Sequence, residues 1–552
     1  MLLPPLDDYA RDAAAYRRPA APETFNYCDI IDAFAEDPTR EALVWLNAAG
    51  DERRLTFAEI RDGSKRIAAA LKARGVGRGD FVLIMLPRLP EWQMTMMAAF
   101  RIGAIAIPCI TMLTPKDLSY RIAATSPKAI ITIPSETEKF AGLAADAARL
   151  VVPYGPGDAG GWEDLLALAA GQGLDVPTER MTSEDGALLY FTSGSTGLPK
   201  GVLHSAYFPR AYYECTAYWF DLNAQSRDDT MWGTSDTGWS FSLTATLVGP
   251  WLAGVRTLTY DGPFDPARRL EIIARHGVTV FAAAASEFRQ MLAQDIESHD
   301  LSRLRLSATA GEALDGPTAR NWIRRAGCRI HEAYGQTEVL MVVANYPAAE
   351  IRPGAMGLPL PGLPIDVISE ADLTPLPAGQ VGHVAIRMPM EGMMLGYWQA
   401  PDKTEACIAT DVNGARWYIS GDLARKDADG YFWYEGRSDD VINTAGYRVG
   451  PAEVEGAVMA HPAVKECAAV ASPDAERGEV VKAFIVLHAG YEPGPALAEE
   501  IQSFVKRETA PYKYPRRIAF IDELPKTTTG KIRRKELRDR EKAERTAGAL
   551  EA

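Results

Sequence analysis

The sequence predicts an α/β protein in which helices alternate with mostly parallel strands. Short apolar runs, typical of strands buried on both faces, alternate with segments whose apolar residues recur at helical spacing. The chain has 552 residues, of which 47% are hydrophobic and 24% charged, as in an ordinary globular protein. That length exceeds what one hydrophobic core supports, so we expect two or more domains.

The expected elements begin after an unpatterned start. Residues 1–50 show little periodicity and are predicted to be a lead-in wrapped over the surface. From Leu55 onward, helical and strand patterns alternate, as in layered α/β units. The expected elements are helix 57–74 ending at Gly75, strand 81–86, helix 91–103, strands 105–108, 129–133 and 279–281, and helix 286–294.

A domain boundary is predicted at residues 437–440. It divides the chain into an N-terminal domain, residues 1–437, and a smaller C-terminal domain, residues 438–552. The smaller domain is expected to contain a helix at 452–460 and a strand at 483–487. Residues 538–552 are charged and alanine-rich, which indicates a solvated terminal helix.

Charge and cysteine content exclude several classes of function. The net charge of −14 and the pI near 5.2 disfavour general binding to nucleic acid or to anionic membranes. The first residues lack the basic and apolar regions of a signal peptide, and no apolar run approaches the ~20 residues that span a bilayer. The six cysteines are scattered without a Cys-x-x-Cys pair, which predicts reduced thiols in a cytoplasmic protein rather than disulfides or a zinc site.

Residues 190–201 are the most informative segment. They form a loop rich in glycine and hydroxyl groups that follows an apolar run and carries one lysine, and such loops can cradle a polyphosphate. Pro199 and Gly201 break the Walker A pattern, which argues against an ATP-dependent kinase of that type. A surface loop is the alternative on these residues alone. The candidate phosphate ligands are Thr192, Ser193, Gly194, Ser195, Thr196, Gly197 and Lys200.

Three later motifs follow this loop in a fixed order. They are Tyr-Gly-Gln-Thr-Glu at 334–338, Ser-Gly-Asp-Leu at 420–423 leading into Gly-Arg-Ser-Asp-Asp at 436–440, and Pro-Lys-Thr-Thr-Thr-Gly-Lys at 525–531. Together the four segments resemble the adenylate-forming, or AMP-binding, superfamily of acyl-CoA synthetases, luciferases and peptide-synthetase adenylation domains. The resemblance runs from about Leu55 to about Leu537. Segments 218–222, 235–239 and 511–516 resemble the medium-chain acyl-CoA synthetase branch.

The resemblance implies both a fold and a reaction. The fold would be a large N-terminal domain of layered α/β subdomains with a small, mobile C-terminal α+β lid. ATP and a carboxylic acid would give acyl-AMP and pyrophosphate with Mg²⁺, and coenzyme A would then displace AMP. A carrier-protein thiol as acceptor and a catalytically inactive nucleotide sensor are the alternatives.

The resemblance also assigns roles within the adenylation site. Lys200 binds the β- and γ-phosphates, Thr337 the α-phosphate, and Glu338 with Thr192 the magnesium ion. Lys531, on the small domain, reaches the carboxylate and the α-phosphate, where an ammonium offsets developing charge. The remaining ATP ligands are Asp422 and Arg437 at the ribose, Tyr334 stacked on adenine, and Gly311, Glu312, Ala313, Gly335 and Gln336 around the base and phosphates.

The C-terminal domain is expected to turn at Asp439 between the two half-reactions. Its opposite face would then form the coenzyme A tunnel. Relatives often carry serine at the position of Ala445, so a hydrogen bond to pantetheine is expected to be missing. Lys531 also has the spacing at which bacterial relatives are acetylated, which implies a lysine acetyltransferase and deacetylase as partners. The expected coenzyme A residues are Ala445, Gly446, Tyr447 and Arg448.

The acyl pocket is expected to be deeper than acetate requires. Acetyl-CoA synthetases carry tryptophan at the position of Gly335, and small side chains leave volume. Alanines 282–285, expected in a helix, would form a wall, although packing alone also accounts for them. No basic residue is placed for a second carboxylate, so we expect a medium-chain, branched or aromatic monocarboxylate. The oligomer is left open between monomer and homodimer. The predicted pocket residues are Trp239, Phe281, Ala283, Ala284 and Gly335.

Overall fold

The computed structural model describes residues 3–144, 146–192, 199–222, 228–312, 314–438, 440, 442–444, 447–474, 477–508, 513–526 and 532–550. Their contacts divide the chain into two compact units. The first comprises residues 1–363 and 389–406, and the second comprises residues 364–388 and 407–552. The predicted boundary after Arg437 falls inside the second unit, and it stays a prediction.

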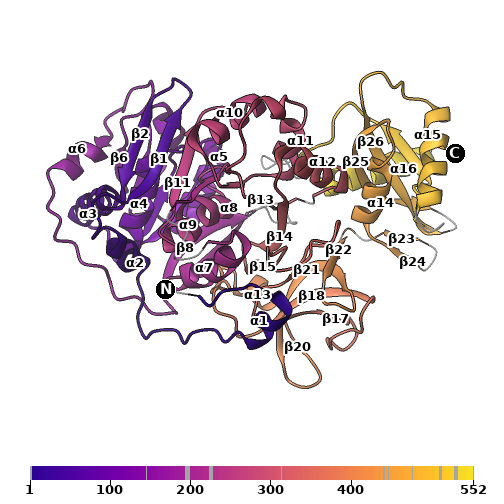
Figure 1. The fold of residues 1–552 in the computed structure, drawn as a ribbon, viewed down its shortest axis with the longest axis horizontal. Helices are drawn as coiled ribbons and strands as arrows, with labels where there is room; N and C mark the ends of the chain where they lie inside the picture. Colours follow the sequence, from indigo (N-terminus) through magenta and orange to yellow (C-terminus); the bar gives the residue numbers. More distant parts are fainter. Residues whose placement is uncertain are drawn as a thin grey trace. The chain divides into compact units, whose positions relative to one another are not determined.

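A nine-stranded sheet with parallel central strands occupies part of the first unit (Figure 1). One face is covered by α10 (Pro266–His276), α11 (Ala285–Met291) and α12 (Gly316–Ala326), which bury Leu270, Phe288 and Trp322 against it. The strands lie in the order β16 (Leu358–Pro359), β15 (Leu340–Ala344), β14 (Ile330–Gln336), β13 (Leu306–Ala310), β12 (Val280–Ala282), β10 (Thr230–Gly233), β11 (Arg256–Asp261), β1 (Glu41–Asn47) and β2 (Glu52–Thr56).

An eight-stranded sheet forms the other large layer of this unit. Its strands are parallel from β8 to β7, whereas β9 runs antiparallel to both β8 and β19. Helix α5 (Pro115–Thr125) and the 3₁₀ helix η1 (Pro134–Phe140) pack on one face. The order is β19 (Gly396–Tyr397), β9 (Lys200–Ser205), β8 (Gly186–Thr192), β4 (Ile105–Pro108), β3 (Phe81–Ile84), β5 (Ala129–Thr132), β6 (Ala148–Val151) and β7 (Glu163–Asp164).

Helices α4 (Pro90–Arg101) and α7 (Phe208–Trp219) of the first unit are buried along their whole length, as expected of helices inside a layered domain. Helix α3 (Phe57–Ala73) starts at a capping box between Thr56 and Glu59. The other helices are α1 (Tyr9–Ala15), α2 (Tyr27–Phe34), α6 (Leu165–Ala170), α8 (Ser240–Leu243), α9 (Gly249–Leu252) and α13 (Pro401–Glu405).

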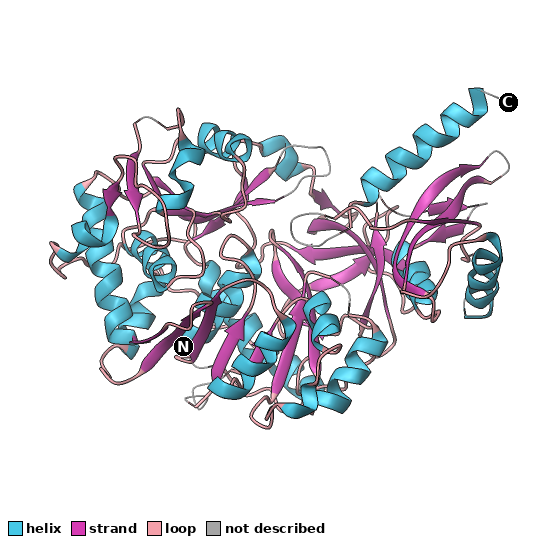
Figure 2. Cartoon of the chain, turned by 90° about the horizontal axis from the view of Figure 1, so that it is seen from above, coloured by secondary structure: helices cyan, strands magenta, loops and turns pink. Residues whose placement is uncertain are grey.

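The second unit contains two five-stranded sheets. One is antiparallel, with β17 (Ile365–Ile368), β18 (Val381–Arg387), β21 (Arg416–Lys426) and β20 (Ile408–Thr410) in order, and β22 (Phe432–Arg437) beside β21. The other contains β24 (Tyr447–Val449), β23 (Ile442–Thr444), β26 (Gly478–Leu487) and β25 (Val464–Asp474), with β27 (Arg517–Phe520) beside β26. Helices α14 (Pro451–Met459) and α15 (Pro495–Glu508) pack on one face of this second sheet, and α16 (Arg534–Leu550) packs on the other (Figure 2).

The α/β class and the mostly parallel large sheets are confirmed. Helix 57–74 and strand 105–108 match α3 and β4 closely. The prediction of a surface lead-in over residues 1–50 is wrong, because β1 lies inside the nine-stranded sheet between β11 and β2. Its apolar stretch is only five residues long, Ala42–Leu46, and a short apolar run carries no periodicity that identifies a strand. No helix in the described ranges has the length and apolar character needed to cross a bilayer.

Candidate functional site

The predicted phosphate loop joins two antiparallel strands of the eight-stranded sheet. Thr192 ends β8 and Lys200 begins β9, and the two residues face each other in the strand register. The Tyr120 hydroxyl donates a hydrogen bond to the carbonyl oxygen of Pro199 at 2.9 Å, which fixes the far end of the loop. The other expected ligands, Ser193, Gly194, Ser195, Thr196 and Gly197, lie outside the described residues.

A second hairpin carries the Tyr-Gly-Gln-Thr-Glu motif. Tyr334, Gly335 and Gln336 end β14, and Thr337 and Glu338 lie in the turn that leads into β15. This hairpin belongs to the nine-stranded sheet, whereas Lys200 belongs to the eight-stranded sheet. The residues predicted to bind the phosphates and the metal ion therefore come from two different sheets of the first unit.

Tyr397 connects the two hairpins. Its hydroxyl donates a hydrogen bond to Glu338 Oε1 at 2.9 Å, and the Lys200 ammonium lies 4.7 Å from its ring centroid. Both distances indicate favourable contacts. Tyr397 is only 7% exposed. We call these three residues the Lys200–Tyr397–Glu338 cluster; the sequence motifs identified its two charged members and missed the tyrosine.

The turn at Thr337 is also held from its backbone. His204 Nε2 donates a hydrogen bond to the Thr337 carbonyl oxygen at 2.7 Å, and the Met394 amide donates to that of Glu338 at 2.8 Å. Burial lowers the pKa of His204 to about 4, so its imidazole is neutral at physiological pH. A carbonyl can only accept, so Nε2 carries the proton. Sequence analysis missed His204 as well.

The paired strand approaches residue 335 so closely that only glycine fits there. The β14–β15 pairing shifts register between Tyr334 and Gly335, and a Cβ at residue 335 would overlap the carbonyl group of Leu340. Leu340 itself has a positive φ of 70°. Close approach of the paired strand therefore excludes a larger side chain in this backbone conformation. The role of Gly335 in deepening an acyl pocket stays a prediction.

Two of the residues expected around adenine, Gly311 and Glu312, follow the adjacent strand β13. Gly311 follows this strand with φ +89°, which favours glycine, and the Glu312 carboxylate accepts a hydrogen bond from the Ser286 amide. Ala313 lies outside the described residues. Glu332 of β14 accepts a hydrogen bond from the Leu314 amide at 3.2 Å, and burial raises the pKa of its carboxyl to about 8.

Glu332 predicts a pH-dependent loss of stability. Between its usual pKa of 4.5 and about 8, the folded chain keeps a proton that the unfolded chain loses, so the free energy of unfolding falls as pH rises. His204 and His331, whose pKa values burial lowers to about 4, act in the opposite direction but only below about pH 6.5. From pH 6.5 to 8 we expect the wild type to lose about 2 kcal/mol relative to Glu332→Gln. Thermal unfolding midpoints of both proteins across this range measure the difference, and parallel curves would contradict it.

The predicted acyl-pocket residues differ in burial: Phe281 and Ala283 are buried, whereas Trp239 and Ala284 are partly exposed. Trp239 precedes α8, and its carbonyl oxygen accepts a hydrogen bond from the Tyr190 hydroxyl at 3.4 Å. Phe281 belongs to β12 and is fully buried, with its ring centroid 5.4 Å from that of Trp232. Ala283 belongs to the same core, and Ala284 is half-buried before α11.

The expectation that alanines 282–285 lie in one helix is wrong. Ala282 ends β12, and α11 begins only at Ala285. Four consecutive alanines favour a helix by propensity, but the parallel strand pairing of β12 with β10 and β13 outweighs it. The acyl-pocket roles of Trp239, Phe281, Ala283 and Ala284 stay predictions.

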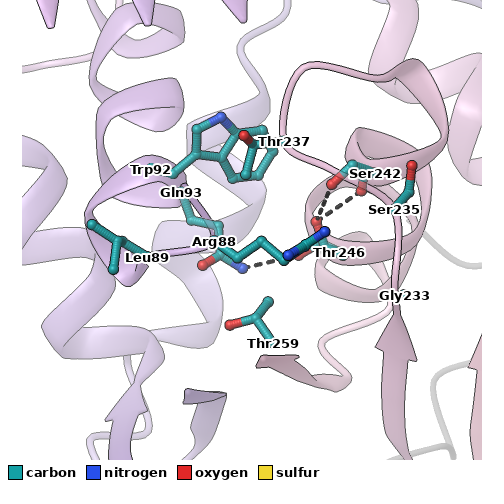
Figure 3. Close-up of a pocket in the computed structure, with 10 residues that line it drawn as sticks. All are labelled: Arg88, Leu89, Trp92, Gln93, Gly233, Ser235, Thr237, Ser242, Thr246 and Thr259. Carbon is teal, nitrogen blue, oxygen red and sulfur yellow. Dashed lines mark hydrogen bonds between the residues drawn. The ribbon is translucent and has the colours of Figure 1, made fainter. Parts of the chain in front are cut away.

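A small cavity lies between α4 and the segment that follows β10 (Figure 3). It has room for about one water molecule, too little for a carboxylic acid. Polar atoms of the buried Trp92, Gln93 and Thr259 have no hydrogen-bond partner among the described residues, which suits an ordered water. The lining residues are Arg88, Leu89, Trp92, Gln93, Gly233, Ser235, Thr237, Ser242, Thr246 and Thr259.

The two predicted ribose ligands are neighbours in the second unit. Asp422 of β21 faces Arg437 of β22 in the register, and Arg437 Nη1 lies 3.2 Å from Asp422 Oδ1. The Tyr434 hydroxyl donates a hydrogen bond to the same oxygen at 3.3 Å. Asp422 is only 4% exposed, so these donors offset the cost of burying its charge. Tyr434 is a third contributor that the motifs did not identify.

Most of the other residues predicted to act in the C-terminal domain lie outside the described residues. They are Lys531, Asp439, Ala445 and Gly446. Tyr447 and Arg448 form part of β24, which pairs with β23. Their proposed roles in catalysis, domain rotation and coenzyme A binding therefore stay predictions.

Comparison with protein families gives two matches. The model described as "AMP-binding enzyme" matches residues 31–398, and the model described as "AMP-binding enzyme C-terminal domain" matches residues 453–531. The first match includes both hairpins of the Lys200–Tyr397–Glu338 cluster. The second covers most of α14 and all of β25, β26, α15 and β27.

Similar proteins span nearly the whole chain. Acyl-coenzyme A synthetase ACSM3, mitochondrial, of Mus musculus is 36% identical, covering 94% of this chain and 91% of its own. Acyl-coenzyme A synthetase ACSM5, mitochondrial, of Rattus norvegicus is 38% identical, with coverages of 95% and 92%. Among solved structures, the anthranilate CoA ligase AuaEII in complex with anthranoyl-AMP has a TM-score of 0.85 at 30% identity, covering 97% and 99%. An acyl-CoA synthetase of Brucella canis has a TM-score of 0.73 at 33% identity, covering 98% and 100%.

Proposed function

The chain belongs to the AMP-binding enzyme family, and we propose that it is an ATP-dependent acyl-CoA synthetase. An oxygen of the acid's carboxylate attacks the α-phosphorus of ATP, the bond to the β-phosphate breaks, and pyrophosphate leaves. The thiol sulfur of coenzyme A then attacks the acyl carbonyl carbon, and AMP leaves with the bridging oxygen. The first step brings an anion to a polyanion, so cations and oriented donors must offset the charge.

One observation carries this proposal most strongly. The fold brings Lys200, which begins β9 directly after the predicted phosphate loop, into one cluster with Glu338 of the β14–β15 turn. A cation beside a carboxylate is the arrangement expected for binding a nucleoside triphosphate, because the cation can contact phosphate and the carboxylate can contact the metal ion. Lys200 would bind the β- and γ-phosphates, and the Thr337 hydroxyl would donate to the α-phosphate. Asp422 and Arg437 would bind the ribose hydroxyls.

The residues present fit a magnesium ion that arrives with ATP. One oxygen of the Glu338 carboxylate accepts a hydrogen bond from the neutral Tyr397 hydroxyl. Among the residues that the structure describes, no cation neutralises the carboxylate there, so its negative charge can bind the metal ion. The described residues contain no group of three or more histidine, cysteine, aspartate or glutamate side chains that could hold a metal. Magnesium in nucleotide sites needs few protein ligands, because phosphate oxygens and water supply the rest. When bound, it would neutralise phosphate charge, with Glu338 and Thr192 as its protein ligands.

The acid we propose is a medium-chain, branched or aromatic monocarboxylate, with coenzyme A as the acceptor. The test is AMP release from ATP and Mg²⁺ across a panel of acids, with and without coenzyme A. AMP release that requires both one class of acid and coenzyme A supports the proposal. Acid-dependent pyrophosphate release that does not depend on coenzyme A would indicate a carrier-protein acceptor, and no turnover with any acid would indicate a nucleotide sensor.

We also propose a cellular location for the protein and a modification that regulates it. The six cysteines form no disulfide, and five of them are buried, as expected in a reducing compartment, so we propose a cytoplasmic location. Acetylation of Lys531 would remove its charge and stop adenylation. Mass spectrometry of native protein that finds Lys531 always unmodified would contradict the second proposal.

Asp439 is proposed as the hinge between half-reactions. Asp439→Pro fixes one backbone angle and should leave acid-dependent ATP–pyrophosphate exchange near the wild-type rate, while slowing thioester formation about tenfold or more. Exchange and acyl-CoA formation are measured on the same preparation. Equal losses in the two assays would contradict the assignment.

A further inference from the structure

We propose that Tyr397 is a positioning residue that holds Lys200 and Glu338 apart and orients them toward the triphosphate and its magnesium ion. The proposal rests on the proposed function and assigns to its nucleotide site a residue outside every sequence motif considered above. The ring face contacts the cation, with Nζ 4.7 Å from the centroid, and the hydroxyl contacts the carboxylate at 2.9 Å. One side chain therefore contacts both charged groups, the ammonium at its ring face and the carboxylate at its hydroxyl.

The backbone around Tyr397 is fixed on several sides. β19 pairs with β9, so that Tyr397 lies opposite Val202 and only two residues from Lys200 along the paired strand. The Tyr397 amide donates to Thr404 Oγ1 at 2.9 Å, and the next amide, that of Trp398, donates to the Gly201 carbonyl oxygen at 2.7 Å. The backbone position of Tyr397 is therefore fixed, and a ring that is only 7% exposed is packed on most sides.

A spacer between these charges has a physical use. A half-buried ammonium and carboxylate attract each other, and a direct ion pair would neutralise the groups that phosphate and magnesium need. A cation–π contact is weak, about 0.5–1 kcal/mol at an exposed site, so incoming phosphate oxygens displace it easily. A neutral hydroxyl at Glu338 Oε1 orients the carboxylate without cancelling its charge.

Two substitutions separate the hydroxyl from the ring. Tyr397→Phe keeps the face under Lys200 but loses the bond to Glu338, and removal of such supporting bonds typically costs about tenfold or more in metal affinity. We expect the Mg²⁺ concentration that half-saturates binding of a fluorescent ATP analogue to rise about tenfold, with metal-free binding unchanged. Tyr397→Leu also removes the ring, so Lys200 and Glu338 can pair directly, and phosphate must then compete with that ion pair; metal-free binding should weaken about two- to fivefold.

The binding assay contains neither acid nor coenzyme A, so it tests Tyr397 even if the chain proves to catalyse another reaction. In a Glu338→Gln background, Tyr397→Phe should have little further effect on the Mg²⁺ requirement, because the carboxylate charge that Tyr397 orients toward the metal is already absent. Tyr154→Phe is the matched control, since its hydroxyl donates to Asp261 at 2.6 Å outside the predicted site. An unchanged Mg²⁺ requirement in Tyr397→Phe, or an equal loss with and without Mg²⁺, would overturn the proposal.

Discussion

Replacing Lys531 with alanine is expected to slow acyl-adenylate formation about 100- to 1,000-fold. The expectation follows from its motif position, which implies an ammonium at the carboxylate and α-phosphate, and loss of one such preorganised group costs that much in comparable sites. Acid-dependent ATP–pyrophosphate exchange measures this first half-reaction. Coenzyme A attack on synthetic acyl-AMP should proceed near the wild-type rate, because the lysine serves only the first step.

Lys526 supplies the matched control for this substitution. It lies five residues earlier in the same segment, and its ammonium pairs with Glu466 Oε2 at 2.7 Å. Both side chains are about one-third exposed, and such pairs contribute little to stability. Lys526→Ala should therefore retain nearly full activity in both assays. Equal losses in the two half-reactions of Lys531→Ala, or an exchange rate like that of the control, would contradict the assigned role.

Replacing Glu338 with glutamine is expected to slow adenylation about a hundredfold and to raise the Mg²⁺ requirement. The amide oxygen can still accept the Tyr397 hydroxyl, so the turn should keep its structure, but the negative charge for the cation is lost. Exchange rates as a function of Mg²⁺ concentration measure the effect.

Glu138→Gln removes an exposed carboxylate of η1 and serves as the control. Thermal unfolding midpoints of both variants should match the wild type, which separates a catalytic loss from unfolding. A Glu338→Gln enzyme with the wild-type Mg²⁺ requirement would show that Glu338 is not the metal ligand.

Local sequence pattern predicted much of the fold. Helix 57–74 was predictable because its apolar spacing is helical and Thr56 with Glu59 forms a capping box. β1 was missed because an isolated short apolar run does not distinguish a buried strand from other buried segments. The alanines at 282–285 were assigned to a helix because propensity is local, whereas the strand pairing that ends at Ala282 is not.

In the candidate site, too, local sequence motifs identified some residues but not those brought together only by folding. Lys200, Glu338, Asp422 and Arg437 could be predicted because motifs of known order contain them. Tyr397 could not, because it lies 59 residues from Glu338 in the chain and contacts it only once the chain has folded. The raised pKa of Glu332 likewise arises from burial after folding, which no neighbouring residue in the sequence indicates.

The central claim is that the acid's carboxylate oxygen attacks the α-phosphorus of ATP. The most direct measurement uses an accepted acid labelled with ¹⁸O in its carboxyl group, with ATP, Mg²⁺ and coenzyme A, and follows the label by mass spectrometry. Attack at the α-phosphorus followed by thiol attack on the carbonyl carbon must leave one ¹⁸O in the phosphate of AMP and one in the acyl thioester. Label found in pyrophosphate or inorganic phosphate, or unlabelled AMP beside acyl-CoA, would contradict the account.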